Sequence, residues 1–425
     1  MKLKNLMFRI FILLFLLLVV VGCSNGNSED SSNGKSGSGD ESVTVNAIFP
    51  SGDGAEDDMK ELTKQFEEEN PNINVELEFV AYNSMKQKIL TSAKTGDYDV
   101  TMVDLPWLAQ FANAGILQEV PGEISQEDKD DIFDPILNGV TYNDKMYAMP
   151  WKNDAKFLFY NKEMLEEGGI DSPPKTWEEF KEQAQKIKDQ DIVEHPTVWS
   201  WSQGEALVCD YVAVSSGLGG DIVKNGEPTF TNENIKEATE FMVDTLETGL
   251  SNPNSTEYLE QDVLDNFINE DSAFALNWSF MYNEVKNSDI ADKLGITIVP
   301  GSEDVKSSTV YGGEGLGITS GSENPEEAWK YIQFLTSKEV QKNNIEITLP
   351  IWKSLYTDEK VLEDNPELVE TAEEQFNHMV SRPKIPAYGE LSQTIQVGVQ
   401  EVLTGNKDVE TGLKDLQKEA ESVMQ

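Results

Sequence analysis

Several residue types are scarce in this chain, and each scarcity excludes a class of function. Lysine and arginine number 33 against 77 aspartates and glutamates, which gives a formal net charge of −44 at pH 7. Nucleic acids and anionic lipid surfaces are bound by a surplus of basic side chains, so the composition argues against both kinds of partner. With His195 and His378 as the only histidines, a histidine-rich catalytic metal site is hard to build. We therefore expect neither a metal nor a cofactor.

Apolar residues, in contrast, are sufficient for large hydrophobic cores. They make up 38% of the chain, and 9% of the residues are aromatic. This content excludes disorder throughout the chain. A length of 425 residues corresponds to about two or three domains of ordinary size.

The one long apolar run lies at the N-terminus and has the features of an export signal. Ile10–Val21 is unbroken and follows a segment that contains Lys2, Lys4 and Arg9. Its 12 residues are fewer than the roughly 20 that a transmembrane helix needs. The run ends in Val-Val-Gly-Cys at residues 20–23, which resembles a bacterial lipobox, where the signal is cleaved on the N-terminal side of the cysteine and that cysteine is diacylated. A plain signal peptide or an N-terminal anchor helix is the alternative.

Cleavage at this point defines the first two segments of the chain. Residues 1–22 would be a lipoprotein signal peptide, and residues 23–42 would be the lipidated Cys23 with a flexible linker that lacks large apolar side chains. The signal holds three bases and no acid, so the remaining chain has 30 bases, 77 acids and a net charge of −47. Because lipidation uses Cys23, Cys209 is left as the only thiol and no intramolecular disulfide is possible.

From residue 43 onward, strand and helix patterns alternate. Strands are predicted over 43–49, 73–79 and 98–103, with helices over 59–66 and 85–93 between them. Three such units in succession predict a mostly parallel sheet covered by helices. Further along, the patterns predict extended segments at 147–150, 157–160, 273–277 and 309–319, and helices from Pro173-Pro174, within 231–270, from Asn324-Pro325 and after Ser392.

Four segments carry a resemblance to a known family. YAMPWKNDAKFLFYNKEML from residue 147, followed by PPKTWEEF, closely resembles the central signature of the extracellular solute-binding proteins of family 1, the maltose-binding-protein-like receptors of ABC sugar importers. FINEDSAFALNWSF (267–280), YGGEGLGITSGSENPEEAWKYIQFLTSKEVQ (311–341) and RPKIPAYGELSQTIQVGVQEVLTG (382–405) resemble further signatures of this family, in the family's order. The resemblance spans nearly all of residues 43–425.

The resemblance implies an α/β fold of the two-lobed, periplasmic-binding-protein type II, in which each lobe is a mixed, mostly parallel sheet flanked by helices. Three hinge crossings would fall near 149–156, 305–311 and 349–354. Lobe 1 would then comprise 43–150 plus 310–350, and lobe 2 would comprise 151–309 plus 351–425.

The resemblance also implies a function. The protein would be a monomeric, lipid-anchored receptor on the outer face of the bacterial cytoplasmic membrane, without enzymatic activity. It would capture a carbohydrate, either a disaccharide or a short oligosaccharide, between its lobes and deliver it to the permease of an ABC transporter. Domain closure around a ligand is an established hinge motion.

A sugar site needs aromatic faces for the C–H side of the pyranose ring and charged or amide groups for its hydroxyls. Trp177 and Trp329 lie on helical core stripes and are expected in the core, whereas Trp199 and Trp201 lie on one strand face that could belong to the core or the cleft. The aromatic candidates for the cleft lie at strand ends, at crossings or in family motifs, and for the tryptophans among them a core position remains open: Trp107, Trp151, Trp278, Phe280, Tyr311 and Trp352.

The acidic candidates mostly follow predicted strands. Asp104 ends the strand over 98–103, at the edge where open α/β sheets bind ligands, although it could also cap the helix before Pro106. Asp53 and Glu56 follow the first strand and have the same two interpretations. Asp154 lies in the first crossing at a ligand position of the family, and Glu205 follows VWSWSQG.

The second crossing contributes backbone and one further acid. Gly312 and Gly313 would let the backbone approach the ligand closely. Glu314 stands where some relatives of the family have a tryptophan, so the identity of the sugar stays open.

Arg382 is the only arginine after residue 22. Its planar fork suits bidentate bonding to sugar diols or to a carboxylate in the cleft, which lysine cannot reproduce. A ligand contact, or the ordering of a carboxylate that binds the ligand, is the prediction; a structural ion pair is the alternative.

Two other functions are compatible with the residues. Asp104 and Asp154 could serve as the acid–base pair of an extracellular glycoside hydrolase. A receptor for a non-sugar solute, such as a polyamine or an anion, is the other; the acidic surplus suits a cation, whereas the aromatic residues suit a pyranose better.

Overall fold

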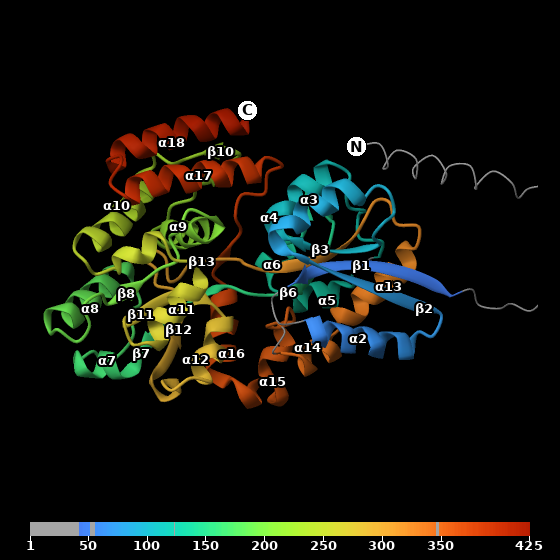
Figure 1. The fold of residues 1–425 in the computed structure, drawn as a ribbon, viewed down its shortest axis with the longest axis horizontal. Coiled ribbons are helices and arrows are strands. Elements are labelled where there is room, and N and C mark those ends of the chain that lie inside the picture. The colour runs from blue at the N-terminus through green and yellow to red at the C-terminus, as the bar shows by residue number, and fades with distance from the viewer. Residues whose placement is uncertain (1–41, 52–55, 123, 346–347) are drawn as a thin grey trace, which may run out of the picture. The chain divides into compact units, whose positions relative to one another are not determined.

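The computed structural model describes residues 42–51, 56–122, 124–345 and 348–425 (Figure 1). Cys23, the linker and Asp53 therefore lie outside the described residues.

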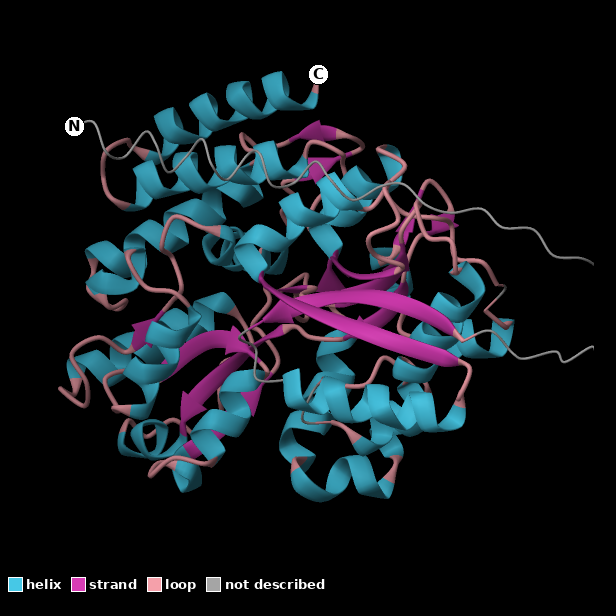
Figure 2. Ribbon diagram, turned by 45° about the vertical axis from the view of Figure 1, so that its right-hand side comes forward, coloured by secondary structure: helices cyan, strands magenta, loops and turns pink. Residues whose placement is uncertain are grey.

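The first sheet has the strand order β2-β1-β3-β14-β6. Its members are β1 (Val43–Ser51), β2 (Ile73–Ala81), β3 (Val100–Asp104), β6 (Met149–Lys152) and β14 (Glu314–Ile318). β1 is parallel to β2 and β3, whereas β14 is antiparallel to β3 and β6. The two long strands β1 and β2 run side by side in Figure 2. The strict alternation of apolar and polar residues in β2 matches a strand with one face buried.

Helices cover this sheet on both sides. They are α2 (Glu56–Glu69), α3 (Tyr82–Ser92), α4 (Leu105–Asn113), α13 (Pro325–Leu335) and α14 (Lys338–Asn343). In Figure 1, α3 and α4 lie above the sheet and α2 lies below it. α13 begins at the predicted Asn324-Pro325, with proline in the first helical turn, where its missing N–H costs nothing.

The second sheet has the order β12-β7-β11-β8. It consists of β7 (Lys156–Asn161), β8 (Thr197–Val198), β11 (Phe274–Trp278) and β12 (Leu294–Thr297). β11 is antiparallel to β7 and parallel to β8. The helices around it are α7 (Lys162–Glu167), α8 (Trp177–Asp189), α9 (Glu205–Gly217), α10 (Glu233–Glu247), α11 (Glu260–Ile268), α12 (Phe280–Lys286), α16 (Pro366–Phe376), α17 (Tyr388–Leu403) and α18 (Val409–Met424).

Short elements complete the described chain. They are α5 (Gln126–Asp131), α6 (Asp134–Gly139), β4 (Thr141–Tyr142), β5 (Lys145–Met146), β9 (Val223–Lys224), β10 (Glu227–Pro228), η1 (Pro253–Thr256), η2 (Ala291–Lys293), β13 (Thr309–Val310), η3 (Lys353–Thr357), α15 (Glu359–Asp364) and β15 (Met379–Val380).

The segments that lead from one sheet to the other lie against each other. Asn153 forms a bridge with Leu349, and Ala155 forms a bridge with Tyr311. β13 pairs in parallel with β15 close by. Residues near each of the three predicted crossings are therefore neighbours, although they are about 150–200 positions apart in sequence.

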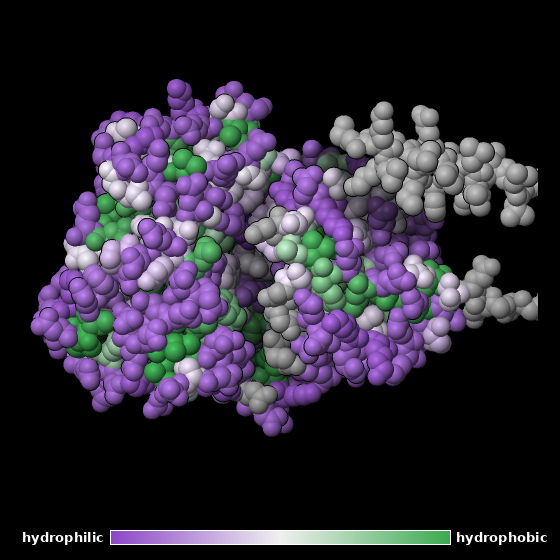
Figure 3. Space-filling model, viewed as in Figure 1, coloured by the Kyte–Doolittle hydropathy of each residue, from purple (hydrophilic) through white to green (hydrophobic). Residues whose placement is uncertain are grey.

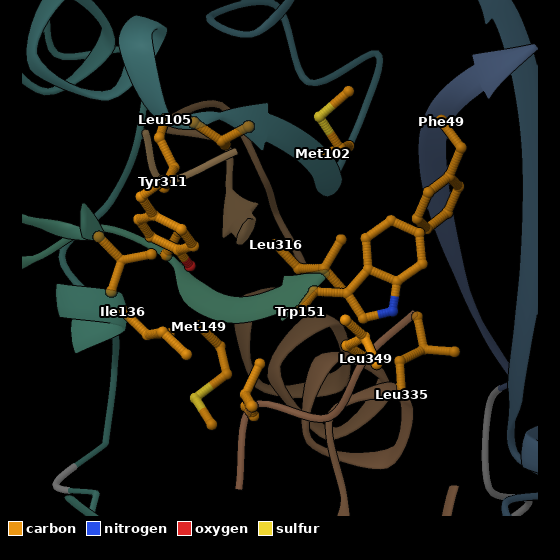
Figure 4. Close-up of a cluster of buried hydrophobic side chains, with 14 of the residues drawn as sticks. Phe49, Met102, Leu105, Ile136, Met149, Trp151, Tyr311, Leu316, Leu335 and Leu349 are labelled. Carbon is orange, nitrogen blue, oxygen red and sulfur yellow. The ribbon is translucent and has the colours of Figure 1, made fainter. Parts of the chain in front are cut away.

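Trp151 belongs to the core beside the first sheet. It is 3% exposed, and its ring meets Phe49 edge-on at 5.5 Å between centroids. Figure 4 shows its indole surrounded by Leu316, Leu335 and Leu349. A separate cluster beside the second sheet contains Trp177, Phe180, Trp199 and Trp201.

The surface in Figure 3 is mostly hydrophilic with small apolar patches. Within the described ranges, none of the helices combines the length and the apolar character that a bilayer crossing requires.

Candidate functional site

Arg382 is the centre of a polar cluster assembled from distant parts of the chain. It is 8% exposed, and its Nη1 donates to Glu205 Oε1 at 2.7 Å. Its Nη2 lies 3.8 Å from Asp104 Oδ1. Because Asp104 ends β3 beside the first sheet and Glu205 begins α9 beside the second, the guanidinium links residues of both sheets.

Glu205 is held in place by α17 as well as by Arg382. The hydroxyls of Tyr388 and Ser392 both donate to its carboxylate. These two residues are four positions apart and therefore lie on one face of α17. Glu205 accordingly has a defined orientation, which a flexible carboxylate on a free helix end would lack.

The carboxylate of Asp104, at the end of β3, also accepts a hydrogen bond from a tyrosine hydroxyl. The hydroxyl of Tyr82 donates to its Oδ2 at 2.5 Å. Burial raises the pKa of Asp104, and the charge of Arg382 opposes this effect. Tyr82 itself is 42% exposed and packs against Trp107, with 5.3 Å between ring centroids. An aromatic face thus stands next to the carboxylate.

A second group of residues surrounds the end of β11, where Trp278, Ser279 and Phe280 form what we call the aromatic corner. Trp278 Nε1 donates to Glu260 Oε1 at 3.3 Å, and Lys156 Nζ lies 5.3 Å from the centre of the Trp278 ring. Phe280, at the start of α12, is 38% exposed. The corner therefore presents apolar ring surface that is partly open to solvent.

Lys156 is fully buried beneath this corner. Its Nζ bonds Ser200 Oγ at 2.9 Å and the carboxylate of Asp210, and neither Lys156 nor Asp210 has exposed side-chain surface. A buried charge is tolerated when it is paired and hydrogen-bonded.

Asp154 connects the aromatic corner to two crossing segments. Its Oδ1 accepts hydrogen bonds from the backbone N–H groups of Ala155 (2.8 Å) and Ser279 (3.2 Å). Its carbonyl oxygen accepts from Gly312 N–H at 3.0 Å. Burial raises the pKa of Asp154 to about 7, although the hydrogen bonds from Ala155 N–H and from the hydroxyl and N–H of Ser279 act to lower it.

The polar cluster and the aromatic corner are joined through residues 312–314. Gly312 packs on the Trp278 ring. Two residues later, Glu314 of β14 lies opposite Asp104 of β3 and Lys152 of β6 in the strand register of the first sheet. Lys152 Nζ lies 3.8 Å from Glu314 Oε2. The arrangement offers both signs of charge and flat rings, but no group of histidine, cysteine or acidic residues in the described part of the chain could hold a metal ion.

Comparisons with known proteins show the family to which the chain belongs. Residues 51–342 match the family described as bacterial extracellular solute-binding protein. The chain belongs to this family. A protein of Deinococcus radiodurans described as a probable ABC transporter-binding protein is 30% identical over 339 residues, which cover 76% of this chain and 80% of the relative.

Two solved structures resemble this solute-binding protein along most of its length. Maltose-bound MalE3 of T. maritima is 29% identical with a TM-score of 0.78, and the match covers 90% of this chain and 100% of that one. A solute-binding protein of Thermotoga lettingae, bound with alpha-D-tagatose, is 28% identical with the same TM-score and the same coverage. The predicted two-lobed α/β fold and the predicted family are thereby confirmed. Family membership also places the protein among the extracytoplasmic substrate-binding components of ABC transporters.

The remaining predicted site residues of this solute-binding protein lie in different surroundings. Trp107 is 7% exposed beneath Tyr82, and Glu56 begins α2 in a partly buried position. Trp151 is in the core, and Trp352, 6% exposed, donates from its Nε1 to the carbonyl of Thr336.

Tyr311 and Gly313 lie together in the second crossing. Tyr311 is 1% exposed, and its ring packs where a side chain on Gly313 would lie. Trp199 and Trp201, whose position the sequence left open, are stacked in the core at 4.9 Å with an interplanar angle of 15°.

Seven contributors to the candidate site were not selected from the sequence: Tyr82, Lys152, Lys156, Glu260, Ser279, Tyr388 and Ser392. Tyr82 follows β2, so the strand-end argument that selected Asp104 could have found it. Tyr388 and Ser392 lie within the recognised motif over 382–405. Glu260 has no sequence signal, because its role depends on how α11 packs beside β11.

Arg382 also contributes to the lining of a cavity of about 930 Å³. Apart from Arg382, its lining contains none of the predicted ligand residues and comes from α6, α9, β9 and residues 219–222, 305–308 and 377–384. We therefore place the candidate site at the polar cluster and the aromatic corner.

Proposed function

We propose that this solute-binding protein captures a carbohydrate, a disaccharide or a short oligosaccharide, and delivers it to the permease of an ABC transporter. The observation that carries the proposal is the position of the Asp104–Arg382–Glu205 cluster, which draws residues from both sheets together next to the aromatic corner.

This combination matches the chemistry of a sugar. The hydroxyls of a pyranose accept and donate hydrogen bonds, which carboxylates and a guanidinium satisfy with defined directions. Its C–H face is apolar and packs on an aromatic ring. The Thermotoga relatives that bind maltose and tagatose give independent support for this class of ligand.

The residues assigned to ligand contact in this proposal are few. Asp104, Glu205 and Arg382 would bond hydroxyls, and Trp278 and Phe280 would supply apolar faces together with Tyr82. The lobe boundaries expected from the sequence belong to the same proposal, with closure of 43–150 plus 310–350 against 151–309 plus 351–425.

Isothermal titration calorimetry tests the ligand class. Maltose, trehalose, maltotriose, D-tagatose and D-mannitol should be titrated into the protein, with spermidine as the non-sugar control. We expect saturable binding of at least one sugar and none of spermidine. Binding of spermidine with no response to any sugar would overturn the proposal.

The same samples test the glycoside hydrolase alternative. We expect maltotriose to be recovered intact after prolonged incubation, as measured by chromatography. Products formed at enzymic rates would show that the acids act in catalysis.

We further propose that Cys23 anchors the protein by lipidation. In the native bacterium, mass spectrometry of the wild type should detect a diacylated N-terminal cysteine, and Cys23→Ser should lack both this modification and cleavage at residue 23. An unmodified Cys23 in the membrane-bound protein would contradict the proposal.

A further inference from the structure

We propose that Asp154 is a positioning residue, which holds the aromatic corner against the second crossing segment. The inference rests on the proposed function in one respect, that the aromatic corner contacts the sugar. The hydrogen bonds of Asp154 that hold the corner are present without a ligand.

Asp154 contacts three parts of the chain through backbone hydrogen-bond donors. Its Oδ1 accepts from Ser279 N–H at 3.2 Å, in the aromatic corner, and from Ala155 N–H at 2.8 Å, in the first crossing. Its carbonyl accepts from Gly312 N–H at 3.0 Å, in the second crossing. One residue therefore connects segments that lie more than 120 positions away from it in sequence.

Gly312 explains why this connection determines the position of the Trp278 ring. A Cβ at residue 312 would lie 2.2 Å from Trp278 Cζ3, so the glycine backbone is in direct contact with the ring. If the backbone at Ser279 moves relative to Gly312, the space that is available to the Trp278 indole changes. Asp154 fixes both of these backbone groups.

The other contacts of the ring cannot replace Asp154. Glu260 accepts from the indole Nε1, and Lys156 lies against the ring, bonded to Asp210 and Ser200. Lys156 also reaches the second crossing, because its carbonyl accepts from the Thr309 hydroxyl at 2.9 Å, but none of these bonds involves Gly312 or Ser279. Asp154 is the member of this set that joins the corner to residue 312.

A positioning role and a ligand contact make different demands on the Asp154 side chain. The two N–H donors need an acceptor oxygen, which the amide oxygen of asparagine supplies equally well. A contact with sugar hydroxyls through a charged acceptor would be weakened when the charge is removed. Asp154→Asn therefore separates the two roles, whereas Asp154→Ala removes both.

The test is fluorine NMR on the ligand-free protein labelled with 5-fluorotryptophan. The chain has eight tryptophans, and Trp278→Phe assigns the resonance of Trp278. We expect Asp154→Ala to shift or broaden that resonance and to leave most of the other seven unchanged, whereas Asp154→Asn leaves all eight in place. An unchanged Trp278 resonance in Asp154→Ala, or equal shifts in both variants, would overturn the proposal.

A matched pair at Ser279 tests the same hydrogen bond from the donor side. Ser279 has φ −58° and ψ −29°, which proline can adopt, so Ser279→Pro removes the N–H with little backbone strain. Ser279→Ala keeps the N–H. The Ser279 hydroxyl also bonds Asp154, so Ser279→Ala removes one of the two bonds from Ser279 and keeps the other. We expect Ser279→Pro, which removes both, to reproduce the effect of Asp154→Ala, and Ser279→Ala to shift the Trp278 resonance less. This pair tests the proposal even if Asp154→Ala fails to fold. Equal spectra for the two Ser279 variants would contradict it.

Titration then relates positioning to function. With whichever of maltose, trehalose, maltotriose, D-tagatose and D-mannitol binds the wild type, we expect a tenfold or greater loss of affinity in Asp154→Ala and less than threefold in Asp154→Asn. A tenfold loss in Asp154→Asn would identify a direct ligand contact. If no sugar binds while the fluorine spectra behave as expected, the proposed function fails and the positioning role remains.

Discussion

Arg382 is a buried cation that lies between two carboxylates. It bonds Glu205, lies 3.8 Å from Asp104 and is almost completely buried. Removing a buried charge leaves its partners uncompensated. We expect Arg382→Ala to weaken sugar binding tenfold or more, with an unchanged far-ultraviolet circular dichroism spectrum. Arg382→Lys is the control for charge: an intermediate affinity would show that the planar fork matters, and wild-type affinity in Arg382→Ala would make the ion pair purely structural.

Asp154 predicts a pH dependence of stability. Its pKa is about 7 in the folded protein, against an ordinary value of 3.8. Between these values the folded protein keeps a proton that the unfolded chain has released, so the free energy of unfolding falls as pH rises through this window. The loss between pH 5 and pH 8 is at most about 3 kcal/mol, since one pKa unit corresponds to about 1.4 kcal/mol.

Urea unfolding at pH 5, 6, 7 and 8, at constant ionic strength, measures this effect. Asp154→Asn cannot ionise, so the difference between its free energy of unfolding and that of the wild type should grow in favour of the variant as pH rises. Parallel curves for the two proteins would exclude a raised pKa at Asp154.

Local rules selected those residues of the candidate site that have a clear signal in the sequence. Arg382 was singled out by its rarity, and Asp104 by its place at the end of a strand. The burial of Trp151 and Trp352 did not follow from such rules, because each packs against residues that are distant in sequence, such as Phe49 and Thr336. Glu260 was missed for the same reason, since its contact with Trp278 depends on tertiary packing.

At the scale of elements, helix α17 is the support on which Glu205 depends. Tyr388 and Ser392 bond its carboxylate from one face of α17, while Glu205 sits at the N-terminus of α9, where an acidic residue is favoured by the helix dipole. Loss of one hydroxyl leaves the other hydroxyl and Arg382 in place. We therefore expect Tyr388→Phe and Ser392→Ala each to reduce sugar affinity by about two- to tenfold, or about 0.4–1.4 kcal/mol. This is less than the roughly 1.5–3 kcal/mol that a hydrogen bond to a charged group contributes, because the carboxylate keeps its other partners.

The double variant measures how the two hydroxyls act together. If both hold the same carboxylate, the loss of affinity in Tyr388→Phe/Ser392→Ala should exceed the sum of the two single losses in free energy. Gln393 follows Ser392 on α17 but is exposed, so Gln393→Ala is the matched control and should bind sugar as the wild type does. Wild-type affinity in all three hydroxyl variants would remove Glu205 from the ligand site.

Elements with strong local signals were predicted well from the sequence. The strand expected over 273–277 is observed as Phe274–Trp278, and the helix expected from Asn324-Pro325 begins at Pro325. The pairing of β13 with β15 was not predicted, because these two-residue strands are about 70 positions apart and carry no periodicity of their own. Such short pairs form only after the surrounding elements have brought them together.

At the scale of the whole molecule, two electrostatic effects on stability oppose each other: repulsion among the many carboxylates and attraction within local ion pairs. The net charge of −44 destabilises the compact state through repulsion between carboxylates. Many of the ion pairs are exposed, as in Lys60–Asp57 and Lys414–Glu410, and exposed pairs contribute little. Salt weakens both effects, but the repulsion involves far more charges than the pairs do.

We therefore expect added salt to stabilise the protein. The Debye length falls from about 10 Å at 0.1 M to about 3 Å at 1 M, so the thermal midpoint should rise as sodium chloride is increased from 0.05 M to 1 M. Two exposed acids at the end of α2, Glu68 and Glu69, provide a matched test. They lie in the last turn of the helix, where the helix dipole disfavours negative charge, and this turn holds no basic residue. Glu68→Gln/Glu69→Gln should raise the midpoint at 0.05 M and reduce the gain from salt. A midpoint that falls with sodium chloride would show that the ion pairs, and not the repulsion, dominate the electrostatic free energy of this protein.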